Sequence, residues 1–484
     1  MNLTVPIHLH ASRYPKKTAV VSGGDSLTFA RLDGLLWRAA RFLRGEGLRA
    51  GNHVAIAYTD PMLHLLVALA LTRIGVGYYA VAPNEGPIIV DEVMRRIGAR
   101  ALIAPGPVEG IAAPRIEGTP ARLFGSQSAP AGDFAEGAAL VWRFVKSSGT
   151  TGQAKLFAAT HRGMAGLMAR FGAAVPTACG DVAMAMSDLS FFSPTRRVFR
   201  DLCNGATVVL PGLATFADTA AMVERHGISR IHAGPWTWKR FLTDPGFDAS
   251  LRKLSVIETG GSIVDAQLRR AILERYTSGL TIVYGANELH PISTAFGQHC
   301  LSAPDTIGWP VPRGEIQIVD AGGTPLGPGQ AGEIRVRDPD MIDRYWDDDD
   351  ATARAFRDGW FYPGDVAQWS ERGELLFKGR ADDMIIYDGI NIFPAEIENC
   401  LMEHPSVREA AAFGVRHPIH GALPWAAVLV SDDVTPTALQ DFALERIGVR
   451  HPRRLAIMTE FPRTARGKAL KREIARIMEA AANG

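Results

Sequence analysis

The chain has 484 residues, which is more than one hydrophobic core usually organises, so we expect at least two domains. Its 52 basic and 51 acidic residues leave a net charge of +1, which excludes a global field that would draw the protein onto nucleic acid or an anionic membrane. Hydrophobic residues make up 47% of a chain without low-complexity tracts, as in globular proteins. The expected partner is therefore a small molecule.

Cysteine spacing and apolar segments predict the cellular location of the protein. The cysteines lie far apart, at Cys179, Cys203, Cys300 and Cys400. They form no CxxC pair, so we expect reduced thiols in a cytoplasmic protein. The segment Met1–His10 lacks the basic and apolar parts of a secretory signal. The most apolar stretch, Leu63–Leu71, is shorter than the roughly 20 residues that span a bilayer. It predicts a buried helix and no membrane span.

The first 300 residues alternate between helices and short apolar strands. Apolar spacing predicts a helix over Thr28–Leu48, a strand over His53–Tyr58 and a helix over Leu63–Ile74. Further strands are expected at Val182–Met186, Ala206–Leu210, Arg230–Ala233, Leu254–Thr259 and Thr281–Tyr284. This alternation favours parallel or mixed sheets layered with helices.

After about Cys300 the pattern changes to short strands separated by Gly and Pro, which is typical of a small antiparallel barrel. These strands are Ile316–Val319, Gly332–Val336 and Gly373–Phe377. The remaining residues mix strands and helices over a length that suits a small domain. We therefore predict an α/β fold with a barrel subdomain in a large domain, residues 1–381, and a small α+β domain, residues 382–484.

The strongest local signal for chemistry is the segment from Lys146 to Lys155. Its central residues are Ser148, Gly149, Thr150, Thr151 and Gly152. Glycines let backbone N–H groups approach an anion, hydroxyls add donors and Lys155 supplies charge, so the segment has the chemistry of a phosphate loop. It does not follow the GxxxxGK[ST] spacing, and alone it is also compatible with a solvated turn.

Four further motifs accompany this loop in a fixed order. They are Tyr284-Gly285-Ala286-Asn287-Glu288, Tyr362-Pro363-Gly364-Asp365, Gly379-Arg380-Ala381-Asp382-Asp383 and Pro462-Arg463-Thr464-Ala465-Arg466-Gly467-Lys468. Their order and spacing over nearly the whole chain resemble the adenylate-forming superfamily. That family holds acyl-CoA synthetases, adenylation domains of nonribosomal peptide synthetases and beetle luciferases.

The resemblance implies roles for ATP and Mg²⁺. Thr150, Thr151 and Lys155 would wrap the β- and γ-phosphates, and Glu288 would hold Mg²⁺, which prefers carboxylate and phosphate oxygens. Tyr284 and its neighbour Gly285 would lie against adenine. The Gly-Gly turn would line the other side of adenine with Gly260, Gly261 and Ser262.

The resemblance also assigns the ribose and α-phosphate contacts. Asp365 would accept hydrogen bonds from both ribose hydroxyls, and Arg380 would reach the ribose or a phosphate. Asn287 stands where the family usually has Thr, and still offers a short polar side chain to the α-phosphate. Pro363 replaces the usual Thr before Gly364.

Three positions near the C-terminus carry the remaining implied roles. Lys468 would be catalytic, because an ammonium placed between the substrate carboxylate and the α-phosphate offsets the repulsion of two anions. Asp382 would be the hinge of a mobile small domain, and Gly389 would line the tunnel for the thiol. The segment Pro462–Lys468 also fits the Pro-x4-Gly-Lys pattern acted on by bacterial protein acetyltransferases, which makes a lysine acetyltransferase an expected partner.

The class of carboxylic acid substrate is predicted from one position at which this chain differs from amino-acid-activating members of the family. Family members that bind α-amino acids use an Asp in a Phe-Asp-Ala-Ser-like segment, and here Phe191 is followed by Phe192 at the Asp position. A buried ammonium without a carboxylate partner is costly, so an uncharged aromatic or medium aliphatic acid is preferred. Trp236 is another candidate pocket wall, although these aromatics are equally compatible with plain core.

The predicted activity is that of an AMP-forming acyl- or aryl-CoA synthetase, with ATP, Mg²⁺ and CoA as cofactors. The alternative is a free-standing adenylation enzyme that loads the phosphopantetheine of an acyl carrier protein, because both acceptors need the same thiol tunnel. A non-enzymatic or luciferase-like use of the fold is disfavoured by the complete set of charged site residues.

Overall fold

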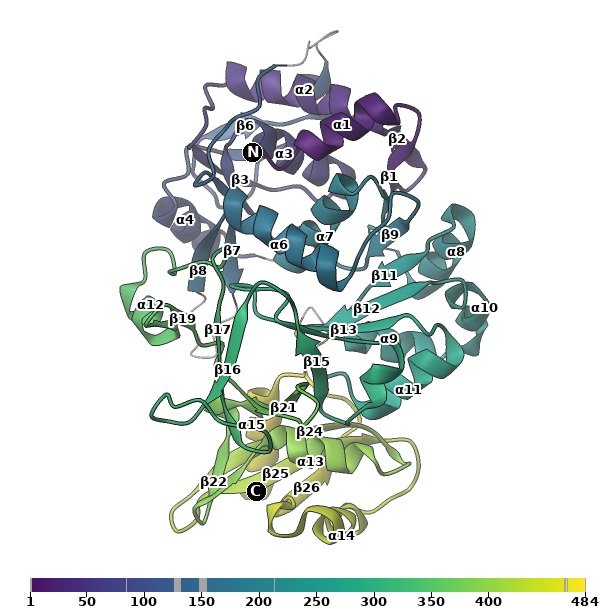
Figure 1. Cartoon of the computed structure of the whole chain (residues 1–484), viewed down its shortest axis with the longest axis vertical. Coiled ribbons are helices and arrows are strands. Elements are labelled where there is room, and N and C mark those ends of the chain that lie inside the picture. The colour runs from purple at the N-terminus through teal and green to yellow at the C-terminus, as the bar shows by residue number, and fades with distance from the viewer. Residues whose placement is uncertain are drawn as a thin grey trace.

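The computed structural model describes residues 2–83, 85–125, 132–147, 155–212, 214–464, 467 and 469–483. Three β-sheets organise these residues, with helices packed on them and between them (Figure 1). The helices of the first two thirds of the chain are α1 (Val5–Arg13), α2 (Phe29–Gly45), α3 (Pro61–Arg73), α4 (Pro87–Arg96), α5 (Pro120–Phe124), α6 (His161–Ala174), α7 (Phe192–Cys203), α8 (Phe216–His226), α9 (Pro235–Leu242), α10 (Asp248–Leu251) and α11 (Ala266–Arg275).

The first sheet has six strands in the order β6-β5-β3-β4-β7-β8, and only the last pair is antiparallel. The strands are β3 (His53–Ile56), β4 (Gly77–Ala80), β5 (Leu102–Ala104), β6 (Arg115–Glu117), β7 (Val141–Ser147) and β8 (Lys155–Thr160). Helix α3 joins β3 to β4; Asp60 caps it by accepting from the backbone N–H of Leu63 at 2.7 Å, with Pro61 in the first turn. The predicted buried helix is confirmed.

The second sheet begins with a mostly parallel half in the order β13-β12-β11-β9-β10-β1-β2, in which only the β1–β2 pair is antiparallel. Its strands are β1 (Thr18–Ser22), β2 (Asp25–Thr28), β9 (Val182–Ala185), β10 (Thr207–Leu210), β11 (Arg230–His232), β12 (Val256–Gly260) and β13 (Leu280–Tyr284). Strands β9 to β13 match those expected from the sequence, whereas β1 and β2 were not expected. The layered α/β architecture is confirmed.

The same sheet continues beyond β13 as an antiparallel group. Its strands are β14 (Ser293–Phe296), β15 (Thr306–Pro310), β16 (Glu315–Val319), β17 (Ala331–Arg337), β18 (Phe356–Arg357), β19 (Trp360–Phe361), β20 (Asp365–Trp369) and β21 (Leu375–Arg380), with α12 (Asp349–Ala355) beside them. The pairings of the described residues leave this group continuous with the large sheet, through β15. The short antiparallel strands are thus as expected, while closure into a barrel stays a prediction.

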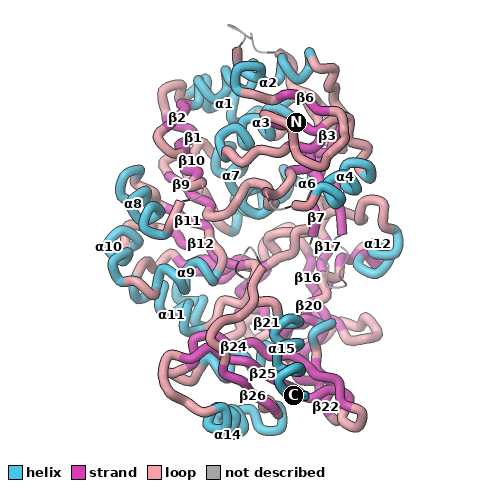
Figure 2. Tube along the Cα trace, turned by 180° about the vertical axis from the view of Figure 1, so that it is seen from behind, coloured by secondary structure: helices cyan, strands magenta, loops and turns pink. Residues whose placement is uncertain are grey.

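A third sheet of five strands contains the C-terminal residues, with β26 beside β25 and the order β23-β22-β25-β24. Its strands are β22 (Ile385–Tyr387), β23 (Ile390–Ile392), β24 (Val407–His417), β25 (Gly421–Val430) and β26 (Arg454–Ile457), and its helices are α13 (Pro394–Met402), α14 (Pro436–Ile447) and α15 (Lys471–Asn483). Figure 2 shows this sheet beneath the large one, with α14 and α15 against it. The boundary at residue 382 stays a prediction.

Helix α7 lies between the two large sheets. On one side, Phe199 packs edge-on against Trp142 of β7, with 4.9 Å between ring centroids. On the other side, the helix contacts β9 and β10. Trp142 and Phe199 are fully buried, so the position of α7 is set from both sheets at once.

A buried ion triad joins α7 to β12. Glu258 accepts from Arg197 at 2.5 Å and from Arg200 at 3.3 Å, and these three side chains are at most 3% exposed. Burial would raise the pKa of the Glu258 carboxyl, but the two guanidinium groups hold it well below its usual value. The triad is therefore charged, and each member depends on the others to offset its loss of hydration.

We expect Glu258→Gln to lower the free energy of unfolding by about 3–5 kcal/mol, because it leaves two buried guanidinium groups without their shared carboxylate. Chemical denaturation at neutral pH measures this change. Glu315→Gln is the matched control, since Glu315 pairs with Arg337 on the surface and its loss should cost less than about 1 kcal/mol. Equal effects of the two substitutions would contradict a stabilising triad.

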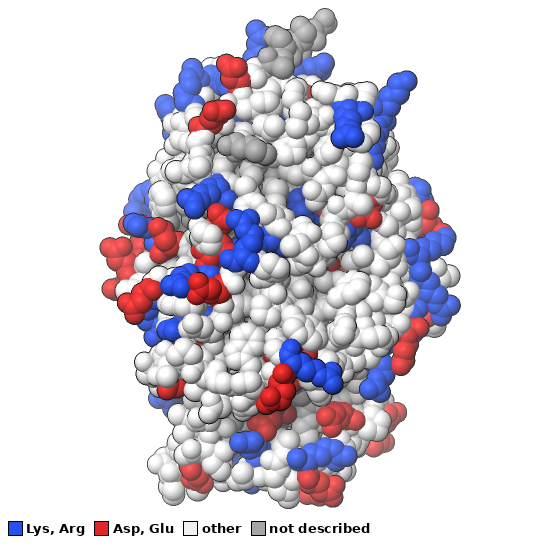
Figure 3. Space-filling view, in the orientation of Figure 1, with Lys and Arg blue, Asp and Glu red and all other residues white. Residues whose placement is uncertain are grey.

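Positive and negative side chains are mixed on the face of the molecule shown in Figure 3. Figure 3 shows Lys and Arg side chains interspersed with Asp and Glu, without one continuous patch of a single sign on the visible face. This agrees with the near-zero net charge. None of the described helices has the length and apolar character needed to cross a bilayer.

Candidate active site

The ends of the neighbouring parallel strands β12 and β13 place two of the predicted nucleotide motifs side by side. Gly260 pairs with Val283 in the strand register, and the strands end in Gly260-Gly261-Ser262 and Tyr284-Gly285. A Cβ on Gly260 would lie 2.2 Å from the carbonyl oxygen of Val283, so only glycine allows this close approach. Ligands commonly bind at such carboxyl ends of parallel strands.

Asp365 lies in reach of two other predicted site residues. The Tyr284 hydroxyl donates to Asp365 Oδ2 at 2.6 Å, and Arg380 donates to Oδ1 at 2.9 Å. Residues 365 and 380 face each other in the β20–β21 register. Burial raises the pKa of Asp365 above its usual value, against the opposing effects of Arg380 and Tyr284. The structure thus brings together Tyr284, Asp365 and Arg380, which lie up to 96 positions apart in the sequence.

Glu288 lies beside this group and is held by Tyr345. The Tyr345 hydroxyl donates to Glu288 Oε1 at 2.8 Å, and the Lys155 ammonium stands 4.8 Å from the centroid of the Tyr345 ring. Burial raises the pKa of the Glu288 carboxyl, and the Tyr345 hydrogen bond and the charges of Lys155 and Arg380 oppose this shift. Because Arg380 acts on both Glu288 and Asp365, the two carboxyl groups belong to one site. Asn287 is partly exposed at the same turn.

The predicted phosphate loop is framed by two paired strands. Ser147 of β7 faces Lys155 of β8 in an antiparallel register, and Lys146 forms an ion pair with Glu85. Tyr79 also donates to Glu85, at 2.7 Å. The loop residues Ser148, Gly149, Thr150, Thr151 and Gly152, and the catalytic candidate Lys468, lie outside the described residues.

The predicted acid segment begins helix α7. Phe192 is 4% exposed and packs between Trp142 and Phe157, with ring centroids 5.8 and 6.0 Å away. Phe191 precedes it as the residue before the helix and is partly exposed. Phe192 therefore lies in the aromatic core at the edge of the site, and its role as a pocket wall stays a prediction.

Buried Arg143 of β7 holds the turn that leads into this segment. Its guanidinium donates to Thr195 Oγ1 at 2.6 Å and to the carbonyl oxygen of Leu189 at 3.2 Å, and it also reaches the carbonyl oxygen of Ser190. Since β7 continues into the predicted phosphate loop, Arg143 ties the acid segment to the strand that positions that loop.

Trp236 meets the C-terminal motif. It lies on α9, is 37% exposed, and packs against Gly467, where a Cβ would lie 2.8 Å from the indole. Gly467 also has a φ of +77°, so glycine is required on two counts. The residue next to Lys468 is thus placed against the large sheet's helices.

The hinge and tunnel candidates differ in their distance from this group. Asp382 accepts from Arg380 at 3.2 Å, directly beside the Asp365 site. Gly389 lies at the exposed tip of the β22–β23 hairpin. Figure 1 places β22 at the bottom of the molecule, away from the ends of β12 and β13. In this arrangement the structure therefore does not bring Gly389 to the site.

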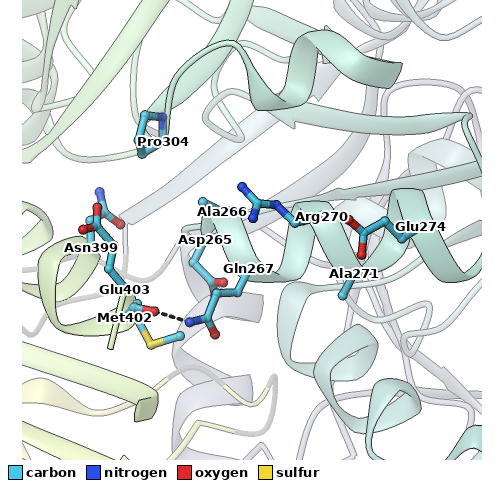
Figure 4. Close-up of a pocket in the computed structure, with 10 residues that line it drawn as sticks. All are labelled: Asp265, Ala266, Gln267, Arg270, Ala271, Glu274, Pro304, Asn399, Met402 and Glu403. Carbon is cyan, nitrogen blue, oxygen red and sulfur yellow. Dashed lines mark hydrogen bonds between the residues drawn. The ribbon is translucent and has the colours of Figure 1, made fainter. Parts of the chain in front are cut away.

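A groove of about 370 Å³ separates α11 from α13 (Figure 4). It is lined by Asp265, Gln267, Arg270, Glu274, Asn399 and Glu403, among others. The Gln267 amide donates to the backbone carbonyl of Met402 across the groove. None of the predicted site residues lines the groove. The groove instead marks where α11 of the large sheet meets α13 of the C-terminal sheet.

Sequence reasoning missed the residues that support the site from outside the motifs, namely Tyr345, Arg143 and Glu85. Tyr345 lies between β17 and α12, more than 50 positions from Glu288, and its neighbours have no motif spacing. Arg143 is close to the phosphate loop in sequence, but its partners are backbone carbonyls almost 50 residues later. A pattern in one sequence carries no signal for such contacts.

The chain is similar to several characterised enzymes. Feruloyl-CoA synthase of Amycolatopsis is 29% identical over 474 residues, which cover 96% of each chain. The salicyl-AMP ligase / salicyl-S-ArCP synthetase of Mycobacterium tuberculosis is 27% identical, over 96% of this chain and 89% of that one. Among solved structures, ATP-bound MatB of Rhodopseudomonas palustris has a TM-score of 0.89 at 21% identity and covers 99% of each chain, which shows a shared fold.

Two family models match the chain over most of its length. The AMP-binding enzyme model matches residues 7–136 and 144–346, and the AMP-binding enzyme C-terminal domain model matches residues 396–468. These matches include the strands β12 and β13 and the Glu288 turn. The predicted resemblance to the adenylate-forming superfamily is confirmed, and the chain belongs to the AMP-binding enzyme family.

Proposed function

We propose that this protein is an ATP-dependent ligase that joins a carboxylic acid to the thiol of CoA. In the first step a carboxylate oxygen of the acid attacks the α-phosphorus of ATP, which forms acyl-AMP and releases pyrophosphate. In the second step the thiol sulfur attacks the acyl carbonyl, loses its proton, and displaces AMP. The observation that carries this proposal is the assembly of Tyr284, Asp365, Arg380 and Glu288 at the ends of β12 and β13.

The nucleotide roles follow from the chemistry of these side chains. Asp365 has accepting capacity beyond its two present bonds, because each carboxylate oxygen offers two lone-pair sites, and it would accept from ribose hydroxyls. Arg380 would turn toward the ribose or a phosphate, and Tyr284 and the Gly260–Ser262 turn would enclose adenine. Lys155, together with the loop before it, would neutralise the β- and γ-phosphates.

Magnesium fits Glu288 best among the described carboxylates of the site. No group of three or more His, Cys, Asp or Glu residues with metal-site geometry exists in the part of the chain that the structure describes. A single carboxylate with phosphate oxygens and water is the usual way in which Mg²⁺ is bound beside a nucleotide. The bound ion would neutralise charge on the phosphates, while Tyr345 orients Glu288 toward it.

Lys468 would supply the ammonium between the carboxylate and the α-phosphate, as the sequence predicts. Acetylation would remove that charge, so we also propose a lysine acetyltransferase as a regulatory partner. The contact of Gly467 with Trp236 supports an arrangement in which the segment carrying Lys468 faces the large sheet.

The thiol acceptor is proposed from similarity to known enzymes, and the acid from one residue of the predicted acid segment. Similarity to feruloyl-CoA synthase supports CoA, whereas similarity to the salicyl-AMP ligase supports the alternative, a carrier-protein phosphopantetheine. Phe192 at the position of the family's Asp argues against α-amino acids, because their ammonium would be desolvated without a partner.

The proposed thiol step requires the small domain to move. Gly389 lies on an exposed hairpin, and the Gln267–Met402 hydrogen bond joins α11 to α13 across the groove in Figure 4. Rotation about Asp382 that carries Gly389 to the site would break this bond. The present arrangement is therefore suited to the adenylation step.

Exchange of pyrophosphate into ATP tests the proposal directly. We expect exchange that depends on an added aryl or aliphatic acid and is absent with free amino acids, followed by thioester formation with CoA. Lys468→Ala should lower exchange by about 10²- to 10³-fold, because it removes one preorganised charge, and should spare transfer from preformed acyl-AMP. Exchange without acid dependence would refute the ligase, and transfer to carrier protein alone would favour the alternative.

The hinge is tested with Asp382→Pro. Proline fixes φ near −65°, so we expect adenylation to persist while thioester formation from acyl-AMP is lost. Asp382→Ala is the matched control, because it removes the same side chain and keeps the backbone free. Normal rates of both steps in the proline variant would place the hinge elsewhere.

Tyr345→Phe tests how Glu288 is positioned. We expect the Mg²⁺ concentration for half-maximal exchange to rise about 10-fold, because a hydrogen bond to a charged group is lost. The same loss raises the pKa of Glu288 further, so Mg²⁺ activation should move to higher pH, where the carboxylate is ionised.

Tyr362→Phe serves as the control for Tyr345→Phe, since the Tyr362 hydroxyl bonds Arg335 away from Glu288. An unchanged Mg²⁺ dependence, or a loss of activity at saturating Mg²⁺ and optimal pH, would contradict a positioning role.

A further inference from the structure

The core behind the predicted acid segment is strongly basic. Helix α7 carries Arg196, Arg197 and Arg200, each at most 3% exposed. Their guanidinium carbons surround the ring of Phe171 on α6, at 5.8, 5.4 and 5.0 Å from its centroid. Arginines are rarely buried unless a specific function or partner holds them there.

The arginines are held in fixed positions next to the acid segment. Arg197 and Arg200 share the carboxylate of Glu258, and Arg200 also donates to Asp201 at 2.8 Å. Arg197 donates further to Ser193 Oγ at 2.6 Å. Ser193 directly follows Phe192 and is partly exposed. The basic groups therefore lie immediately behind an accessible residue of the predicted acid segment.

Two histidines lie against these arginines. His232 ends β11, opposite Glu258 in the strand register, and His290 follows the Glu288 turn and stacks on Phe171 with 5.3 Å between ring centroids. The Nδ1 atom of each ring is buried and has no hydrogen-bond partner within the described ranges. Burial and then Arg197 hold the pKa of the His232 imidazole well below its usual value.

A buried polar atom without a hydrogen-bond partner destabilises a fold, so two of them beside the same arginines need an explanation. Other buried histidines of this chain, such as His161, also have an unpartnered nitrogen. Only His232 and His290 combine it with neighbouring arginines and with the ends of the strands that form the candidate site. An oxygen acceptor placed between them would satisfy both rings, each as the tautomer with Nδ1 protonated.

This cluster borders the candidate site. Ser193 belongs to the acid segment, Glu258 lies two residues before Gly260, and His290 packs on Gly285, where a Cβ would lie 2.8 Å from its ring. Ser193, His232 and Gly285 are partly exposed. A ligand bound beside Gly285 would therefore lie close to the cluster.

We infer that the acid substrate carries a second carboxylate, which lies against His232 and His290 in the positive potential of the α7 arginines. The imidazole N–H groups supply hydrogen bonds, and the arginines compensate the buried negative charge. An apolar tail would leave both rings unsatisfied, and an ammonium would be repelled. This inference rests on the proposed ligase function and names its substrate class as dicarboxylic acids, in place of the uncharged acids that Phe192 alone suggested.

Matched pairs of acids test the inference with the full-length protein. Glutarate is compared with pentanoate, and terephthalate with 4-methylbenzoate, by acid-dependent exchange and thioester formation. We expect kcat/KM for each diacid to exceed that of its monoacid by at least about 10-fold, the effect of one hydrogen bond to a charged group. A monoacid that reacts as well as its diacid would overturn the inference.

His232→Phe removes the proposed contact without changing the size of the side chain greatly. It should lower kcat/KM for the diacid by at least about 10-fold and leave the monoacid within about threefold, and His232→Gln, which keeps an N–H donor, should recover part of the loss. His161→Phe is the matched control, because His161 also has a buried unpartnered ring nitrogen and begins α6 at the far end of β8 from Lys155. Equal losses for both acids in His232→Phe, with an unchanged melting temperature, would overturn the inference.

Calorimetric binding of the acids alone separates the two proposals. Diacid binding that is lost in His232→Phe, without any exchange activity, would keep the inference and refute the ligase. Exchange with monoacids and no diacid binding would keep the ligase and refute the inference.

Discussion

The pairing of Glu258 with Arg197 and Arg200 is the interaction on which the site depends. It joins helix α7, which begins with the acid segment, to strand β12, which ends in the Gly260–Gly261 turn. Because all three charges are buried, loss of Glu258 would leave Arg197 without its carboxylate and Arg200 with its ion pair to Asp201. The distance between the segment for the acid and the edge for the nucleotide is therefore set by a core contact, and the two reactants of the proposed first step meet in a fixed geometry.

Near this buried contact, the carboxylates of Asp365 and Glu288 form hydrogen bonds that a ligand could replace. Asp365 is bonded by Tyr284 and Arg380, and Glu288 by Tyr345, so each carboxylate is oriented before a nucleotide or metal ion arrives. Such preorganisation lowers the cost of ordering the site when ligands bind. The C-terminal part meets the rest of the chain at several places: Gly467 contacts Trp236, Gln267 donates to the carbonyl of Met402, and α13 lies against β21.

Much of this could be predicted from local patterns. The strands over residues 182–186, 206–210 and 281–284 and the buried helix after Asp60 follow from apolar spacing and capping chemistry. The motif residues Tyr284, Glu288, Asp365 and Arg380 were found because each lies in a short segment with its own spacing, and the structure does bring these four together. The short antiparallel strands after residue 300 were also predicted, but their closure into a barrel depends on pairing between distant strands, which leaves no local trace. Gly389 lies on the β22–β23 hairpin, away from the ends of β12 and β13.

The sequence by itself determined the family, the order of strands and helices, and the residues that carry charge toward a nucleotide, because these depend on periodicity and on motifs read within a few residues. Only the tertiary structure decided what surrounds them. The Arg-Arg-x-x-Arg pattern at positions 196–200 would suit a solvated helix face, yet all three side chains are buried, since α7 is enclosed by both sheets. Tyr345 and Arg143 likewise bond to partners that lie 57 and 46 positions away in the sequence. Burial and long-range contact arise from the packing of whole elements. This is the physical reason why the buried arginine cluster on α7 could be recognised only in the folded protein.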